Sequence, residues 1–346
     1  MFSQLKKELD AQLPRFIKDV DRHFGLRAIS PLIFDKIQEY ICRDGKRIRP
    51  ILFVLGYRGF SRKQPKNLYT SALATEILHD FLLIHDDIID KSDMRRGKPA
   101  MHTMLNQYLK VYPQAKFNGS DLAIVIGDIM YAIAIEAFLS IEENPVRKEK
   151  ALRKFIEAAC YTGCGEFIDT VSGAKNIENI SEKEIYAIYD YKTAYYTFSC
   201  PLTTGAILAG AKEKDIAYLH KYGIYLGRAF QIKDDILGIF AEEAHTGKSS
   251  TSDIEENKKT LLLWHAFQHA TKTEKDEINT LLGKNKISLS DIEKMRAIMT
   301  RTKSLEYAKN SIASMLAEAL TAIKHCTIKT DYKKTLTEYS QAILKV

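Results

Sequence analysis

The stretch His79-Asp-Phe-Leu-Leu-Ile-His-Asp-Asp-Ile-Ile-Asp90 closes an apolar helical pattern with three carboxylates, Asp86, Asp87 and Asp90. On an α-helix Asp86 and Asp90 lie one turn apart on the same face, and Asp87 lies about 100° around the axis. Converging carboxylates repel one another unless a cation lies between them, and oxygen ligands suit Mg2+, which also binds phosphate oxygens. The stretch therefore predicts a magnesium-dependent diphosphate site, although the same residues are compatible with a solvated acidic helix end.

The composition is that of a globular protein with a sizeable core. The chain has 346 residues, of which 45% are hydrophobic, enough for one large domain or two average ones. Its formal net charge of +7 is compatible with an anionic ligand or with weak nucleic-acid contact, and it does not distinguish between the two. The five cysteines are an odd number without CxxC spacing. They indicate neither a disulfide framework nor a zinc ribbon, and they favour a reducing, cytoplasmic compartment.

Neither a targeting segment nor integral membrane association is predicted. Residues 1–10 carry acidic side chains and lack the long apolar core of a signal peptide. The longest apolar run, Leu122 to Phe138, is interrupted by Asp128 and Glu136, which argues against a membrane-spanning helix. A helix this apolar is instead expected in the centre of a bundle or in an interface.

Helical periodicity runs through the whole chain. It recurs at residues 3–24, 67–90, 120–140, 146–172, 181–210, 213–240, 256–270 and 289–326. Ser30-Pro31 has the order of an N-cap and a first helical residue, and Ser181/Glu184 and Ser290/Glu293 have the spacing of capping boxes. With 8 prolines, 17 glycines and no strand pattern, residues 1–346 are predicted to form a single all-α domain, a bundle of about a dozen helices.

A second acidic pair ends another apolar helical pattern, in Gln231-Ile-Lys-Asp-Asp-Ile-Leu-Gly-Ile-Phe240. Taken alone, Asp234 and Asp235 would more often be surface charge. Two buried helices with carboxylates near their ends can, however, line one cavity of a helical bundle, where such bundles hold metals. The two clusters are therefore predicted to face each other.

Basic residues accompany both clusters. Those after the first cluster are Arg95 and Arg96, and those after the second are Lys248 and Lys258. Upstream, Gly45-Lys-Arg-Ile-Arg-Pro50 places three cations at a helix start, where backbone N–H groups and the helix dipole also favour an anion. Diphosphates held by metal need such cationic partners, although Arg47 is also compatible with an exposed basic turn.

Five motifs in this order resemble the trans-isoprenyl diphosphate synthase family: GKRIRP at 45–50, DDIID at 86–90 with RRGKP at 95–99, YKTAYYTF at 191–198, FQIKDDILG at 230–238 and GKSSTSD at 247–253. The chain is most similar to archaeal-type members. The resemblance implies the isoprenoid synthase fold, an all-α bundle with a central apolar cavity. It further implies a homodimer in which Mg2+ ions, about three per site, bridge an allylic diphosphate to both acidic clusters.

The implied reaction is a head-to-tail condensation. An allylic diphosphate (dimethylallyl, geranyl or farnesyl) loses pyrophosphate to give an allylic cation, which the double bond of isopentenyl diphosphate attacks. Loss of a proton to the pyrophosphate completes each cycle, so no dedicated side-chain base is required.

The resemblance also assigns roles to individual residues. The metal ligands are Asp86, Asp87 and Asp90 in the first cluster and Asp234 and Asp235 in the second. The allylic diphosphate contacts are Arg95, Lys192, Lys248 and Lys258, and the isopentenyl diphosphate contacts are Lys46, Arg49, His79 and Arg96. The catalytic set is Asp86, Asp90, Lys192, Thr193, Gln231 and Asp234. The role of His79 depends on the resemblance, because a histidine in an apolar helix is more often a core residue.

Two positions depart from the family pattern. Gly238 stands four residues after Asp234, where many members have Asp, and Glu166 stands where Gln is common. Asp253 is expected near the metals, so activity is expected to persist. A non-catalytic subunit of a heteromeric synthase is the alternative. His265 and His269, one helical turn apart without a third ligand, are interpreted as surface residues.

Product length is predicted from Leu82 and Phe81, four and five positions before Asp86. In the family, bulky residues at these positions close the apolar pocket, and one aromatic residue rather than two is typical of twenty-carbon synthases. The hypothesis is geranylgeranyl diphosphate, and the alternative is a farnesyl or longer-chain product. The GKRIRP motif argues against a terpene cyclase, which needs no acceptor-diphosphate pocket. Nucleic-acid binding is not expected, because the basic residues lie beside acidic clusters.

Overall fold

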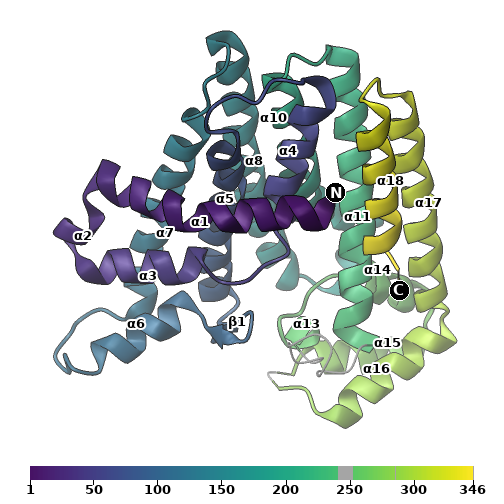
Figure 1. The fold of residues 1–346 in the computed structure, drawn as a ribbon. Coiled ribbons are helices and arrows are strands. Elements are labelled where there is room, and N and C mark those ends of the chain that lie inside the picture. Colours follow the sequence, from purple (N-terminus) through teal and green to yellow (C-terminus); the bar gives the residue numbers. More distant parts are fainter. Residues whose placement is uncertain (241–251, 285, 346) are drawn as a thin grey trace. The chain divides into compact units, whose positions relative to one another are not determined.

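A computed structural model gives the structure of residues 1–240, 252–284 and 286–345 (Figure 1). Helices dominate these described residues, and their only strands are two short ones, so the predicted all-α class is confirmed. Contacts divide the chain into two compact units. Met1–Phe155 with Pro201–Lys212 forms unit 1, and Ile156–Cys200 with Glu213–Val346 forms unit 2. The single-domain organisation stays a prediction.

Unit 1 is built from helices that surround α5. Its elements are α1 (Phe2–Phe24), α2 (Leu26–Ile29), α3 (Pro31–Ile41), α4 (Ile48–Phe60), α5 (Leu68–Ile89), β1 (Met94–Arg95), β2 (Lys98–Pro99), α6 (Met101–Leu109), α7 (Gly119–Leu139), the first turns of α8 (Pro145–Gly173) and most of α10 (Cys200–Leu208). Helix α5 packs along α7 and also against α4. Its apolar residues Leu73, Ile77 and Ile84 are buried, so the helix that ends in the first acidic cluster is anchored in the core.

A two-stranded hairpin follows the acidic end of α5. Strands β1 and β2 pair antiparallel through Met94 with Pro99 and Arg95 with Lys98. The two turn residues between them, Arg96 and Gly97, have φ angles of 54° and 72°, as in the tight turns that join neighbouring strands. The sequence pattern indicated only a loop at this point, because two residues per strand are too few to show alternation.

Helix α7 is long and apolar enough to cross a membrane, by length and composition. It is the one helix of this kind in the described part of the chain, and 44% of its apolar window is buried. Packing against α5 and α6 covers one side, while Ile124 and Val125 are 43% and 53% exposed on another. Core helices of globular proteins have the same composition.

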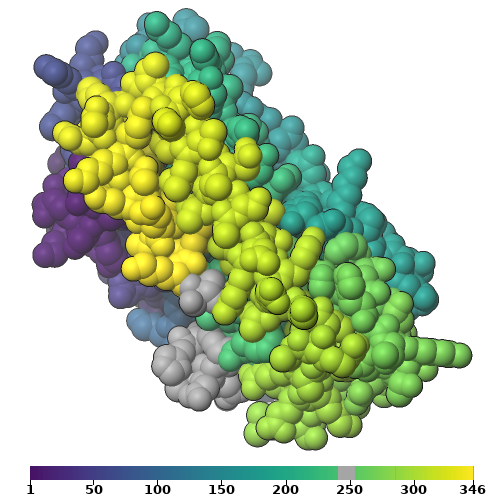
Figure 2. Space-filling model, turned by 90° about the vertical axis from the view of Figure 1, so that its right-hand side faces the viewer, coloured from purple at the N-terminus to yellow at the C-terminus, as the bar shows by residue number. Residues whose placement is uncertain are grey.

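Unit 2 is organised around α11. Its elements are the rest of α8, η1 (Ile177–Asn179), α9 (Glu182–Ile188), the π-helical segment η2 (Tyr189–Ser199), α11 (Glu213–Phe240), α13 (Ser252–Glu255), α14 (Leu261–His269), α15 (Lys272–Leu282), α16 (Leu289–Arg301), α17 (Ser304–His325) and α18 (Thr330–Ile343). Helix α11 packs against η2 and α17. Helices α17 and α18, in yellow tones, lie together on the face seen in Figure 2.

Several predicted helix ends are confirmed. Ser30 caps α3 with Pro31 at its start, and Ser181 with Glu184 forms the capping box of α9. The capping box predicted at Ser290/Glu293 is wrong, because Ser288 and Asp291 form it two residues earlier. These caps depend on local spacing, so an error of two residues in the helix start moves the whole box.

Two further predictions in unit 2 are corrected. The pattern at residues 289–326 contains two helices, α16 and α17, because Lys303 between them adopts a left-handed conformation with φ 58°. His265 is not a surface residue. It is 9% exposed, its Nδ1 lies 3.1 Å from the Ser304 hydroxyl, and its ring stacks on Tyr307. Its neighbour His269 is exposed as predicted.

Candidate active site

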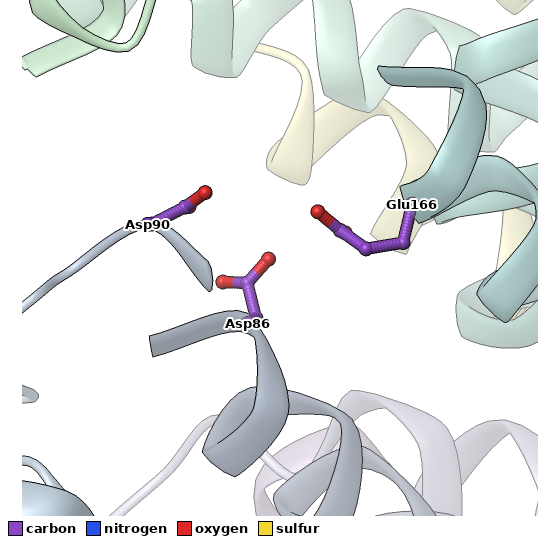
Figure 3. Close-up of side chains that lie close together, drawn as sticks. All are labelled: Asp86, Asp90 and Glu166. Atoms are coloured by element: carbon purple, nitrogen blue, oxygen red, sulfur yellow. The ribbon is translucent and has the colours of Figure 1, made fainter. Parts of the chain in front are cut away.

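The first acidic cluster lies at the C-terminal end of α5. Asp90 is the C-cap residue of this helix, and its backbone N–H donates to the Asp86 carbonyl. One carboxylate oxygen of Asp86 and one of Asp90 lie within 4.8 Å of each other. Figure 3 shows the two side chains pointing toward the same region. The one-turn spacing therefore brings these two carboxylates together, as the sequence predicted.

The third carboxylate of the cluster, Asp87, is buried and differs from its neighbours. Its Oδ1 is paired with Arg95, whereas its buried Oδ2 has no hydrogen-bond partner among the described residues. Burial raises the pKa of Asp87, although hydrogen bonding to Arg95 opposes the shift. Two partly exposed carboxylates beside a buried, unpaired carboxylate oxygen fit a hard divalent cation such as Mg2+.

Arg95 connects the hairpin to the acidic cluster. Its Nε donates to Asp87 Oδ1 over 2.7 Å, and its Nη2 donates to Asp86 Oδ2 over 3.1 Å. Strand β1 carries Arg95, so the turn that closes the hairpin also sets the direction from which this guanidinium approaches. A residue predicted to bind the allylic diphosphate thus lies beside two predicted metal ligands.

The residues predicted to bind isopentenyl diphosphate come from three segments of unit 1. Lys46 is exposed in the turn before α4, Arg49 is buried in the first turn of α4, and the side chain of Arg96, in the hairpin turn, is 26% exposed. His79 on α5 is partly exposed. Loss of hydration, reinforced by the nearby charges of Arg49 and Arg96, holds the pKa of His79 well below its ordinary value. His79 is therefore a neutral hydrogen-bonding group in a cationic environment.

Arg47 does not belong to an exposed basic turn. It is 2% exposed, and its guanidinium donates to Asp10 Oδ1 over 2.9 Å, to Glu76 Oε1 over 2.9 Å and to the Arg43 carbonyl over 2.6 Å. These bonds tie α1 and α5 to the turn before α4. The sequence did not indicate Asp10 and Glu76 as partners, because they lie 37 and 29 residues away.

Lys192 in unit 2 lies between two carboxylates of α8. Its ammonium nitrogen is 2.9 Å from Glu166 Oε2 and 2.7 Å from Asp169 Oδ2. Glu166, which Figure 3 also labels, extends from α8. Asp169 was not identified from the sequence, since only contact between α8 and η2 brings it to Lys192. Glu166, which stands where glutamine is common in the family, gives Lys192 a charged partner.

A hydrogen-bonded chain joins η2 to α11 in unit 2. The Thr193 hydroxyl donates to Gln231 Oε1 over 2.7 Å, and Gln231 Nε2 donates to Asp235 Oδ1 over 3.0 Å. The buried Tyr189 hydroxyl donates to the other oxygen of Asp235 and accepts a bond from the Leu261 N–H. The structure thus brings together three predicted residues, Thr193, Gln231 and Asp235. Tyr189 was missed because its partner lies 46 residues away.

The two carboxylates of the second acidic pair differ in their exposure to solvent. Asp235 is 5% exposed and Asp234 is exposed, as consecutive residues on an amphipathic helix would be. Gly238 lies one turn further along α11, which continues without a break to Phe240. Lys258 lies 2.5 Å from Glu256 Oε2. Lys248 and the side chain of Asp253 lie outside the described residues.

Phe81, the predicted chain-length residue, packs between α5 and α7. Its ring centroid lies 5.2 Å from that of Tyr131 on α7 and 4.8 Å from that of His85. Leu82 beside it is partly buried. Tyr131 was not identified from the sequence, because its aromatic partner lies on another helix. A tyrosine in the middle of a strongly apolar helix was the available signal.

Comparisons with known proteins agree on one family. The family model described as polyprenyl synthetase matches residues 31–299. The chain is 35% identical to a geranylgeranyl diphosphate synthase of Saccharolobus solfataricus, over 76% of this chain and 75% of that protein. It is 31% identical to a geranylgeranyl diphosphate synthase of Methanosarcina mazei, over 83% of this chain and 82% of that protein.

A solved structure extends the similarity to the fold. Geranylgeranyl pyrophosphate synthase from Corynebacterium glutamicum, complexed with isoprenyl diphosphate and magnesium, superposes with a TM-score of 0.89 at 26% identity. The match covers 100% of this chain and 99% of that one. The family model covers more than half of the chain, and its match includes both acidic clusters and the basic residues described above. This protein therefore belongs to the polyprenyl synthetase family.

Proposed function

We propose that the protein is a magnesium-dependent prenyltransferase that condenses isopentenyl diphosphate with dimethylallyl, geranyl or farnesyl diphosphate and makes geranylgeranyl diphosphate and pyrophosphate. The observation that carries the proposal is the pair Asp86 and Asp90, whose carboxylate oxygens lie within 4.8 Å of each other beside Arg95. Membership of the polyprenyl synthetase family, with relatives named geranylgeranyl diphosphate synthase, supports the substrates and the product.

The acidic clusters are proposed to hold the allylic diphosphate through Mg2+, with about three ions per site. Magnesium supplies neutralisation of the charge that develops on the departing pyrophosphate. Asp86 and Asp90 of the first cluster and Asp234 of the second act as ligands. Asp87 and Asp235, each next to one of these ligands along the chain, are buried. The idea that both clusters serve one diphosphate rests on family membership.

Cationic side chains complete the allylic site. Arg95, Lys192 and Lys258 contact the diphosphate, and Lys248 is proposed to join them. Each of the first three has a carboxylate partner within the protein, which keeps it in place before substrate arrives and is exchanged for the diphosphate when it binds. The C–O bond breaks as the charge on the leaving group is neutralised in a water-poor site.

The remaining residues act on the acceptor and on the cation. Lys46, Arg49, Arg96 and neutral His79 bind the diphosphate of isopentenyl diphosphate. Thr193 and Gln231 direct oxygen atoms toward the developing allylic cation, and the bond between them fixes their orientation. The acceptor double bond attacks the cation, and a proton passes to the released pyrophosphate.

Product length is proposed to be set by Phe81 and Leu82, with the ring of Tyr131 supporting Phe81. An aromatic floor of this kind stops the growing chain where the apolar pocket becomes too short for another five-carbon unit. Twenty carbons is the length of the geranylgeranyl group for which the relatives from Saccharolobus solfataricus and Methanosarcina mazei are named.

The decisive experiment is a product assay. Purified protein is incubated with Mg2+, labelled isopentenyl diphosphate and each allylic primer, and the dephosphorylated products are sized. We expect a dominant twenty-carbon alcohol that disappears when Mg2+ is chelated and in the D86A variant. A dominant fifteen-carbon or much longer product would refute the assignment of length. Turnover only after addition of a second, homologous chain would identify a non-catalytic subunit.

The protein is further proposed to be a cytoplasmic homodimer that pairs through α7. Ile124 and Val125 expose apolar surface on this helix, and burying such surface between two copies is favourable. All five cysteines are free, which supports a reducing compartment. Light scattering after size exclusion tests the dimer. V125D should shift the mass toward the monomer, whereas V111D, at an exposed position in the loop before α7, should not.

A further inference from the structure

Asp80 is a buried carboxylate whose role the proposed reaction does not explain. It lies on α5 directly after His79, and it is 0% exposed. Neither of its oxygens has a hydrogen-bond partner among the described residues. Burying an ionised carboxylate without hydrogen bonds is costly, so this position calls for a compensating charge or a proton.

Arg96 is the compensating charge. Its Nη1 lies 3.8 Å from Asp80 Oδ1, beyond hydrogen-bond distance but close enough for a strong electrostatic interaction. Arg47, whose charge also acts on this carboxylate, is already bonded to Asp10 and Glu76. Arg96 is 26% exposed at its side chain, so it can also meet a ligand that arrives from solvent.

The charged and titratable groups around Asp80 come from every neighbouring element. They are Glu76 on the preceding turn of α5, Arg47 in the turn before α4, Arg49 in α4, Arg96 in the hairpin, and Tyr40 and Cys42 at the end of α3. Burial raises the pKa of Asp80 to about 8, and the charge of Glu76 adds to the rise, whereas the three arginines oppose it. The carboxyl group therefore changes between its neutral and ionised forms near pH 8 rather than near pH 4.

We propose that ionised Asp80 is the internal counter-ion of Arg96 while the acceptor pocket is empty, and that this carboxylate takes up a proton from solvent when isopentenyl diphosphate binds there. This inference rests on the proposed function. A diphosphate that engages Arg96 withdraws positive charge from Asp80 and adds negative charge nearby, and both effects favour the neutral acid. Binding and protonation are therefore linked, so the affinity for the acceptor falls as pH rises above the range in which Asp80 is neutral.

Asp80 acts through Arg96, so it is a positioning residue and needs a readout other than turnover. Isopentenyl diphosphate alone, without a primer, is titrated calorimetrically into the protein at pH 8.5 in buffers of different ionisation enthalpy, which gives the protons taken up per ligand. The wild type should take up several tenths of a proton more than D80N, because the amide of this variant cannot titrate. The ligand's own ionisation is common to both proteins and cancels in the difference. D35N, which removes an exposed charge on α3, should match the wild type.

The pH dependence of KM gives a second measurement that needs no variant. Between pH 7 and 9.5 the wild-type KM for isopentenyl diphosphate should rise by up to about tenfold per pH unit above the transition, while the KM for the allylic primer does not follow it. D80N should flatten the rise. Equal proton uptake by wild type and D80N, or a flat wild-type KM, overturns the inference. Absence of any binding of isopentenyl diphosphate to the wild type overturns the proposed function and this inference with it.

Discussion

A Cβ atom on Gly165 would lie 2.3 Å from the backbone nitrogen of Lys192, so the contact between α8 and η2 requires a glycine at this point. The same contact holds the Lys192 ammonium 2.7 Å from Asp169 and 2.9 Å from Glu166. A close backbone approach therefore positions a side chain predicted to bind the allylic diphosphate.

Replacing Gly165 by alanine should push α8 and η2 apart. We expect G165A to lose roughly 1–3 kcal/mol of unfolding free energy through overpacking, and to bind the allylic diphosphate more weakly because Lys192 moves with its backbone. Gly163 in the same helix has no atom within 4 Å of its hypothetical Cβ, so G163A should be neutral or gain up to about 1 kcal/mol. Urea denaturation and KM for farnesyl diphosphate provide the comparison. Similar behaviour of the two variants would contradict the close-contact argument.

Restoring the family's glutamine at position 166 should improve allylic binding. If Lys192 binds the allylic diphosphate as proposed, Glu166 competes with the diphosphate for its ammonium group. An amide competes less, because the ion pair between Glu166 and Lys192 is stronger by about 1 kcal/mol than a hydrogen bond from the ammonium group to a neutral amide. E166Q should therefore lower the KM for the allylic diphosphate by roughly three- to tenfold. E149Q, which removes an exposed carboxylate from the same helix, is the control. An unchanged or higher KM in E166Q would show that Glu166 does not restrain Lys192 in this way.

Loss of one carboxylate from the first cluster should act on turnover rather than on folding. D86A should reduce kcat/KM by at least about 100-fold and raise the Mg2+ concentration needed for half-maximal rate, while its thermal unfolding stays close to that of wild type because Asp86 is partly exposed. The control is D35A, which removes one carboxylate at an exposed position of unit 1. Steady-state rates over a Mg2+ titration test this expectation, which fails if D86A and D35A have the same Mg2+ dependence.

Both rings of the Phe81–Tyr131 pair should influence product length. With the ring centroids 5.2 Å apart, removing either ring creates space at the α5–α7 contact. F81A and Y131A should each shift the product distribution by one or more five-carbon units beyond twenty carbons. Tyr108, near the end of α6, is 39% exposed, and its ring is tilted against that of Tyr112, so Y108A should leave the distribution unchanged. If only F81A lengthens the product, Tyr131 is not part of the floor.

Asp80 should make stability depend on pH in a definite direction. Its pKa in the folded protein lies above the unfolded value of 3.8, so between these two values the folded state binds more protons than the unfolded state. The contribution of Asp80 to the free energy of unfolding therefore falls as pH rises from about 4 to about 8, and it stays constant above that range. The Tm of D80N minus that of wild type should accordingly increase between pH 5 and 8, by about 2–4 °C for each kcal/mol. A difference that is constant across this range would contradict the shifted titration.

Much of this site could be inferred from the order of residues along the chain, because the physics involved is local. Asp86 and Asp90 share a helix face at any one-turn spacing, Ser181 and Glu184 cap a helix through bonds three residues apart, and the motifs around both clusters identify the family. Local rules failed where a single residue decided the outcome. The left-handed Lys303, for example, divides one apparent helix into α16 and α17.

The pattern from His79 to Asp90 indicated a metal site, but it did not indicate which cationic side chain pairs with each carboxylate. Three pairings depend on packing between elements that are distant in the sequence. They are Arg95 with Asp86 and Asp87, Tyr189 with Asp235, and Arg96 with the buried Asp80. Periodicity tells which face of a helix is buried, because that depends on neighbours three and four residues away. It does not tell which other helix covers that face. Folding of unit 1 therefore decided that Asp80, one residue after His79, lies in the electrostatic field of Arg47, Arg49 and Arg96.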